Sequence, residues 1–171
     1  METADLSAFS LVLVRDGEIV HRGRERGIKP LIDCLEGYDA SRGRVVVWDR
    51  VVGLAAARLM VYAGFVAAVR ARVASVPARD FLARHGLDLR AEEIVEAILT
   101  PDGKNVCPGE IIALETEDPL AFIREIKTRW AGYCDVPLPD KADQDFEDCR
   151  GQCGYTPWCR ACKESRGLGY L

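Results

Sequence analysis

The cysteines close to the carboxyl end of the chain are the residues whose types and spacing most clearly suggest chemistry. Four of them fall within residues 149–162, with three, five and two residues between successive members: Cys149, Cys153, Cys159 and Cys162. Thiolates this close in sequence can surround one tetrahedral Zn²⁺ ion or one iron–sulfur cluster. We predict a four-cysteine metal site, with zinc favoured over an iron–sulfur cluster and with free or redox-paired thiols as the alternative.

A second group of polar residues lies between a predicted buried strand and a predicted buried helix. Asp49 and Arg50 follow the apolar run 45–48, and Gly53 precedes the almost wholly apolar segment 54–63. Ligands of open α/β sheets bind at the carboxyl ends of the strands. We therefore predict a ligand site in which Asp49 contacts a hydroxyl or amine and Arg50 binds an anionic group, with Gly53 beside them. The structural alternatives are that Asp49 caps the helix and that Arg50 is an ordinary surface residue.

Two further candidates open a later helix. Cys107 and Glu110 stand three residues apart at its start, which places them on one face. The helix dipole would lower the pKa of the thiol, and the carboxylate could accept protons, so both are candidate catalytic residues. The alternatives are a buried thiol and a first-turn carboxylate that favours the dipole of its own helix. The sequence shows no companion base for a cysteine nucleophile.

The elements that would position these residues alternate between strands and helices. Asp16-Gly17 predicts a hairpin turn, because a primed turn needs positive φ. Apolar spacing and cap residues then predict a helix over 27–36, a strand from 45, a helix over 54–63, a strand over 65–73, a helix over 75–84 with Ser75 as its cap, a strand over 93–100 and a last helix over 119–130. This order predicts an α/β fold with a three-layer mixed sheet and helices on both faces.

Three segments together resemble an uncharacterised bacterial domain family that is similar to the cytidine-deaminase-like fold. They are 26–31, 49–57 and 107–110, and the resemblance covers roughly residues 8–130. The zinc deaminases of that fold carry H-x-E and P-C-x-x-C motifs that hold the metal and move protons. This sequence has neither motif, and Asp49 to Gly53 occupies the place expected for the second. The resemblance therefore implies a deaminase-like domain without ordinary hydrolytic deamination.

Composition narrows the class of protein. The 171 residues carry a net charge of −4 with a pI near 5.3, which argues against a nucleic-acid binder, and we read the basic cluster of residues 22–29 as a solvated loop. No apolar run reaches the roughly 18 residues that span a bilayer, and the first residues do not resemble a signal peptide, so we expect a cytoplasmic protein. We expect a domain over 8–132, an acidic linker over 133–148 and a metal-binding module over 149–171.

The preferred interpretation is a domain of unknown function that binds a small, nucleotide-like ligand near Asp49 and Arg50 and carries a metal-binding tail. One rival is a redox or transfer enzyme that uses an iron–sulfur centre or Cys107 and Glu110. Another is a protein-interaction module whose zinc only stabilises the tail. A homo-oligomer is compatible with each of the three.

Overall fold

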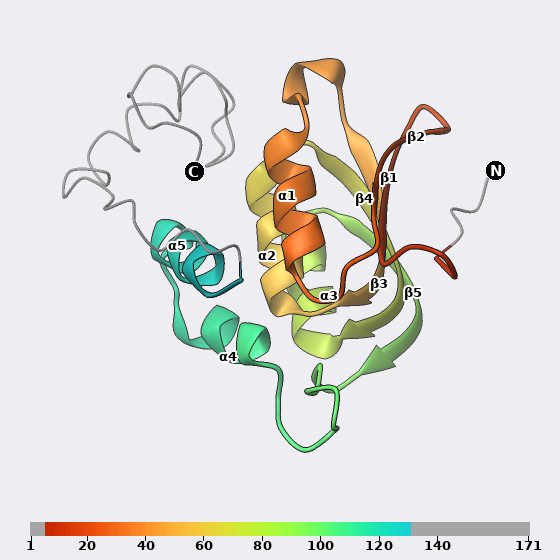
Figure 1. The fold of residues 1–171 in the computed structure, drawn as a ribbon. Helices are drawn as coiled ribbons and strands as arrows, with labels where there is room; N and C mark the ends of the chain where they lie inside the picture. Colours follow the sequence, from red (N-terminus) through yellow and green to blue (C-terminus); the bar gives the residue numbers. More distant parts are fainter. Residues whose placement is uncertain (1–5, 131–171) are drawn as a thin grey trace.

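One five-stranded mixed sheet organises the molecule (Figure 1), for which the computed structural model describes residues 6–130. The strands lie in the order β2-β1-β3-β4-β5; β1 is antiparallel to β2 and to β3, whereas β3, β4 and β5 are parallel to one another. In chain order the elements are β1 (Leu11–Arg15), β2 (Glu18–Gly23), α1 (Lys29–Gly37), the 3₁₀ turn η1 (Ala40–Arg42), β3 (Val45–Val52), α2 (Leu54–Ala63), β4 (Val66–Ser75), α3 (Val76–Arg84), β5 (Asp88–Val95), α4 (Pro108–Glu115) and α5 (Pro119–Trp130).

Local signals in the sequence produce the turns and caps that were predicted from them. Asp16 and Gly17 both have positive φ, 51° and 84°, as a primed hairpin turn requires. The Ser75 side chain accepts a hydrogen bond from the Ala78 N–H at the start of α3. Gly64 ends α2 in the left-handed conformation with φ 76°. The hairpin and these helix boundaries are therefore confirmed.

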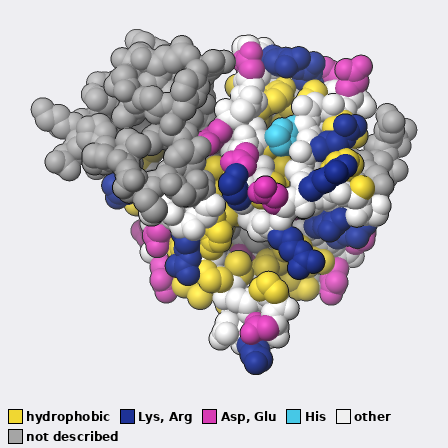
Figure 2. Space-filling model, viewed as in Figure 1, with side chains coloured by type: hydrophobic (Ala, Val, Ile, Leu, Met, Phe, Trp, Pro, Cys, Tyr) yellow, Lys and Arg dark blue, Asp and Glu magenta, His cyan; other side chains and the backbone are white. Residues whose placement is uncertain are grey.

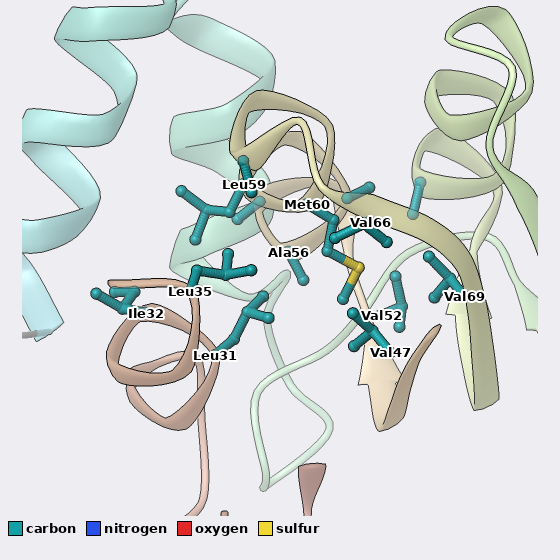
Figure 3. Close-up of a cluster of buried hydrophobic side chains, with 14 of the residues drawn as sticks. Leu31, Ile32, Leu35, Val47, Val52, Ala56, Leu59, Met60, Val66 and Val69 are labelled. Atoms are coloured by element: carbon teal, nitrogen blue, oxygen red, sulfur yellow. The ribbon is translucent and has the colours of Figure 1, made fainter. Parts of the chain in front are cut away.

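The helix α2 is the centre of the core. Eight of its ten residues are buried, because α1 and α3 flank it, the sheet lies beneath it, and α4 and α5 pack on its outer side. Figure 3 shows side chains of α1, β3 and β4 gathered around it, with Leu31, Val47 and Val69 directed toward Ala56 and Met60. Contact on every side explains why α2 is apolar over almost its whole circumference.

The helices lie on a single face of the sheet, so the prediction of helices on both faces is wrong for residues 6–130. Figure 1 shows α1, α2 and α3 against one face, with α4 and α5 beyond them. The strands β2, β3, β4 and β5 are parallel, and their order across the sheet is their order in the chain, with β1 inserted between β2 and β3. Right-handed crossovers between successive parallel strands therefore place α1, α2 and α3 on the same side of the sheet. The three layers are therefore sheet, inner helices and outer helices. On the opposite face, Trp48 of β3 lies beside Arg70 of β4.

The last strand also differs from the prediction. A strand was expected over 93–100, whereas β5 covers Asp88–Val95 and the following residues form a loop held by a bridge between Leu99 and Val106. β5 is an edge strand whose side chains are mostly exposed, so it lacks the apolar run that marks a central strand. The apolar residues that suggested a strand belong partly to this loop, where Ile98 packs beside Gly53.

Candidate functional site

A cavity of about 480 Å³ lies where β3 ends and α2 begins. Residues from six segments line it, which brings together parts of the chain that are distant in sequence. Its lining consists of Ser10, Arg24, Arg26, Gly27, Ile28, Asp49, Arg50, Val51, Gly53, Ala55, Ala56, Ile98, Cys107, Gly109, Glu110 and Trp130. All five residues predicted as ligand-binding or catalytic, namely Asp49, Arg50, Gly53, Cys107 and Glu110, lie around this one cavity.

Glu110 connects α4 to the start of α2. Its side chain is 2% exposed, and its Oε2 accepts a hydrogen bond of 2.5 Å from the Leu54 N–H. A carboxylate at a helix amino terminus is stabilised by the N–H groups and by the helix dipole. Glu110 lies in the first turn of α4, as the structural alternative has it. Its oxygen also caps α2, because α4 packs across the amino terminus of α2.

Gly53 makes room for this contact. A Cβ atom at position 53 would lie 2.7 Å from Glu110 Oε2 and 3.2 Å from a side-chain carbon of Ile98. Real Cβ atoms essentially never show a contact as short as 2.7 Å, and a contact of 3.2 Å is unusually tight. The φ of Gly53 is −88°, so the glycine is required by the close approach of Glu110 and not by its own backbone conformation.

The second carboxylate oxygen of Glu110 has no hydrogen-bond partner among residues 6–130, although it is fully buried. A buried carboxylate oxygen without a donor costs free energy that a donor from a bound molecule would recover. Glu110 is one of the residues that line the cavity. This half-satisfied carboxylate is the strongest indication that the cavity receives a ligand.

Asp49 contributes a second carboxyl group. Burial raises its pKa to about 7, although backbone N–H groups of Val51 and Arg50 oppose the shift by hydrogen bonding to it. The Val51 N–H lies 3.2 Å from Asp49 Oδ1. At neutral pH Asp49 therefore exchanges between a protonated form that can donate a hydrogen bond and an ionised form that can only accept. The alternative that Asp49 caps α2 is wrong, because Gly53 occupies the cap position.

Arginines line one side of the cavity. Arg50 donates from Nε to the Leu6 carbonyl at 2.7 Å and from Nη2 to the Ser7 carbonyl at 2.6 Å, so its guanidinium fixes the segment before β1. Arg24 lies 4.9 Å from the ring centre of Phe9, and Arg26 lines the cavity beside it. Figure 2 shows Lys and Arg side chains gathered on the side of the molecule that carries β1 and β2. Part of the basic cluster that we read as a solvated loop therefore borders the cavity.

The two cysteines of the described region differ in their surroundings. Cys107 occupies the cap position of α4, is partly exposed and lines the cavity. Cys34 is buried in α1, and burial raises the pKa of its thiol far above the ordinary value, with Asp49 and Asp33 adding to the shift. A thiol with so high a pKa is unreactive, so Cys107 is the cysteine that can meet a ligand in the cavity.

Several residues that line the cavity were not predicted from the sequence. Trp130 is the last residue of α5, Ile98 belongs to the loop after β5, and Ser10 precedes β1. Each reaches the cavity through tertiary packing, and none carries a local motif. The arginine-rich segment before α1 had a usable signal, because several guanidinium groups next to a helix start form an anion-binding pattern.

The predicted metal ligands Cys149, Cys153, Cys159 and Cys162 lie outside the described residues, as do the acidic linker and the metal-binding module. Within residues 6–130, His, Cys, Asp and Glu side chains nowhere form a group of three that could hold a metal ion. The same part of the chain has no helix that is both long and apolar enough to cross a membrane.

Comparison with known families assigns the domain. The family described as TM1506, domain of unknown function DUF1893, matches residues 3–129. The chain belongs to the DUF1893 family. A search of curated proteins found no match.

A solved member of the same family has a similar structure. The crystal structure of a DUF1893 family protein (TM1506) from Thermotoga maritima is 27% identical in sequence, and the superposition has a TM-score of 0.64. The alignment covers 72% of this chain and 82% of that one. This DUF1893 domain therefore shares its α/β arrangement with the Thermotoga protein.

Proposed function

We propose that this DUF1893 domain binds a small, nucleotide-like molecule in the cavity between β3, α2 and α4. In this proposal the polar head of the ligand meets Glu110 and Asp49, and its anionic group meets the arginines at the side of the cavity. The volume of about 480 Å³ lies within the usual range of 300–1,000 Å³ for small-molecule sites. We also propose that the fold is cytidine-deaminase-like. We do not propose that the domain catalyses deamination.

The unpartnered Oε1 of Glu110 is the observation that carries this proposal. Residues that only stabilise a fold are selected for complete hydrogen bonding, since a lone buried acceptor is costly. A ligand N–H or O–H group that reaches Oε1 would remove the cost on binding. The ligand therefore has at least one donor on the part that enters deepest.

The arginines support an anionic group elsewhere on the ligand. Arg24 and Arg26 belong to the loop that enters α1, and both line the cavity together with Gly27 and Ile28 at the start of that helix. Guanidinium groups recognise phosphates and carboxylates through paired N–H donors, and a helix amino terminus adds a favourable dipole. A nucleoside monophosphate combines this anionic group with the hydrogen-bonding ring that suits Glu110.

Calorimetric titration of the full chain with AMP, GMP, CMP and UMP tests the proposal. We expect at least one of them to bind with a Kd below about 1 mM. Arg26→Ala should weaken that binding about tenfold through the loss of one charge-assisted contact. Arg72→Ala is the matched control, because Arg72 is exposed on β4 and does not line the cavity. Equal affinity in both variants, or no binding by the wild-type chain, would contradict the proposal.

For the tail we propose that Cys149, Cys153, Cys159 and Cys162 bind one zinc ion. The spacing of four thiolates supports this, and an iron–sulfur cluster is the competing occupant. Metal analysis and a visible spectrum of protein purified without oxygen separate the two. Zinc without colour supports a structural site, and its loss in Cys159→Ser/Cys162→Ser would assign the ligands. Iron with sulfide would contradict the zinc assignment.

A further inference from the structure

The start of α2 differs from the start of every other α-helix within residues 6–130. Prolines occupy the first or second position of α1, α3, α4 and α5, where the missing N–H group would have had no helical partner: Pro30, Pro77, Pro108 and Pro119. The second position of α2 is Ala55. The first turn of α2 therefore keeps all its N–H donors.

These donors are only partly used inside the domain. The Leu54 N–H donates to Glu110 Oε2. The Ala55 and Ala56 N–H groups have no acceptor among the residues that the structure describes, although their residues are only 4% and 6% exposed. Buried backbone N–H groups without an acceptor are rare in folded proteins. Ala55 and Ala56 both line the cavity, so an acceptor can reach these groups from the ligand.

Unpaired donors and an unpaired acceptor thus meet at one place. Glu110 Oε1 lacks a donor, and it belongs to the side chain whose other oxygen binds the first N–H group of the same helix turn. Resting on the proposed function, we infer that the cavity reads the edge of a planar ring on which an N–H group lies beside an acceptor atom. The ring N–H donates to Glu110 Oε1, and the neighbouring acceptor receives the N–H groups of Ala55 and Ala56.

This arrangement makes the site selective between bases of similar shape. Uracil and guanine present a ring N–H beside a carbonyl, whereas cytosine and adenine present an amino group beside a ring nitrogen that accepts. The two edges have donor and acceptor in opposite order. An anionic group held by the arginines fixes the orientation of the ring, so one order pairs with Glu110 and α2 while the other brings donor against donor.

The test measures the affinities of UMP, CMP, GMP and AMP for the wild-type full chain and two variants by calorimetry. Glu110→Gln keeps an oxygen for the Leu54 N–H and replaces the free acceptor by an NH₂ donor. Ala55→Pro removes one N–H donor at a position where α1 and α3 already contain proline. Thermal unfolding of each variant confirms that it is folded, and Glu110→Gln alone decides the test if Ala55→Pro does not fold.

We expect the wild-type chain to bind UMP at least about tenfold more tightly than CMP, or GMP at least about tenfold more tightly than AMP. The opposite preference in the wild-type chain would overturn the inference. Both folded variants should reduce that ratio to less than about threefold. A ratio that persists in the variants overturns the inference and leaves the proposed function intact. The absence of nucleotide binding by the wild-type chain overturns the proposed function and this inference with it.

Discussion

The two ends of the contact between α2 and α4 carry reciprocal caps that differ in one respect. Glu110 of α4 caps the amino terminus of α2, and Arg58 of α2 caps the carboxyl terminus of α4. Both side chains are buried, at 2% and 4% exposure. The arginine has partners for its donors, whereas the carboxylate has a partner for only one of its two oxygens within residues 6–130.

The Arg58 end is complete as a structural device. Its guanidinium donates to the carbonyls of Ala113, Thr116 and Glu117 and to the Tyr62 hydroxyl, and it lies 4.1 Å from the ring centre of Phe122. The Glu110 end adjoins the cavity and lacks this completeness. A buried charge alone therefore does not identify a ligand site, and the missing partner is what distinguishes the two ends.

Removing the Arg58 side chain, which caps the carboxyl terminus of α4, should have the largest effect on stability. We expect Arg58→Ala to lower the free energy of unfolding by about 3 kcal/mol, because the carbonyls at the end of α4 lose their donors in a buried place. Chemical denaturation measures this value. Arg124→Ala on the exposed face of α5 is the control and should change it by less than about 0.5 kcal/mol. Equal effects would contradict the structural role of Arg58.

The pH dependence of stability should reveal the buried carboxyl group of Asp49 on the cavity side. The pKa of Asp49 is about 7 in the folded state against 3.8 for an ordinary aspartate, so the folded state binds more protons between these values. Its contribution is complete below about pH 4 and is lost as the pH rises through 7. We expect the free energy of unfolding of Asp49→Asn, relative to that of wild type, to be about 2 kcal/mol higher at pH 8 than at pH 5. Chemical denaturation of both proteins at the two pH values measures this difference. A constant difference between the two proteins would refute the raised pKa.

Adding a methyl group at Gly53 tests the close approach of Glu110 to the start of α2. Gly53→Ala should lower the free energy of unfolding by about 1–2 kcal/mol, because the added Cβ displaces Glu110 from the Leu54 N–H. In a Glu110→Ala background the same change should cost clearly less, because the φ of Gly53 suits alanine and the 3.2 Å approach to the Ile98 side chain is the tight contact that remains. A double-mutant cycle of Gly53→Ala and Glu110→Ala checks this prediction, and additive changes in the free energy of unfolding would contradict it.

Glu110→Gln should have the smallest effect on stability, within about 1 kcal/mol of wild type, because the amide oxygen still accepts from Leu54. Its effect on ligand affinity should exceed its effect on unfolding. The comparison between Glu110→Gln and Arg58→Ala thus separates a residue that serves a ligand from one that serves the fold. A large loss of stability in Glu110→Gln would show that Glu110, like Arg58, serves mainly to stabilise the fold.

The sequence predicted the centre of the fold better than its periphery. The buried strand β3 and helix α2 have strong apolar patterns, and the Asp16-Gly17 turn and the Ser75 cap have local chemistry that needs no partner. The edge strand β5 has no such pattern, and the side of the sheet that the helices cover depends on strand order, which no single segment encodes.

The candidate site was predicted in the same unequal way. The position of Asp49 in the carboxyl-terminal half of a central strand follows from general rules of α/β sheets, although β3 continues to Val52. The role of Glu110 does not, because it depends on α4 crossing α2, a contact between residues 56 positions apart. Trp130 and Ile98 reach the cavity for the same reason, and the lack of proline in the first turn of α2 gains its meaning only once the cavity is known.

The most direct test is a titration of the ¹⁵N-labelled full chain with nucleoside monophosphates, followed by NMR. We expect saturable shifts of the amide signals of Gly53, Leu54, Ala55 and Ala56, with little change in those of residues 113–117 at the Arg58 end. Shifts confined to 113–117, or no shifts at millimolar nucleotide, would contradict the claim that the incomplete cap at Glu110 marks a ligand site.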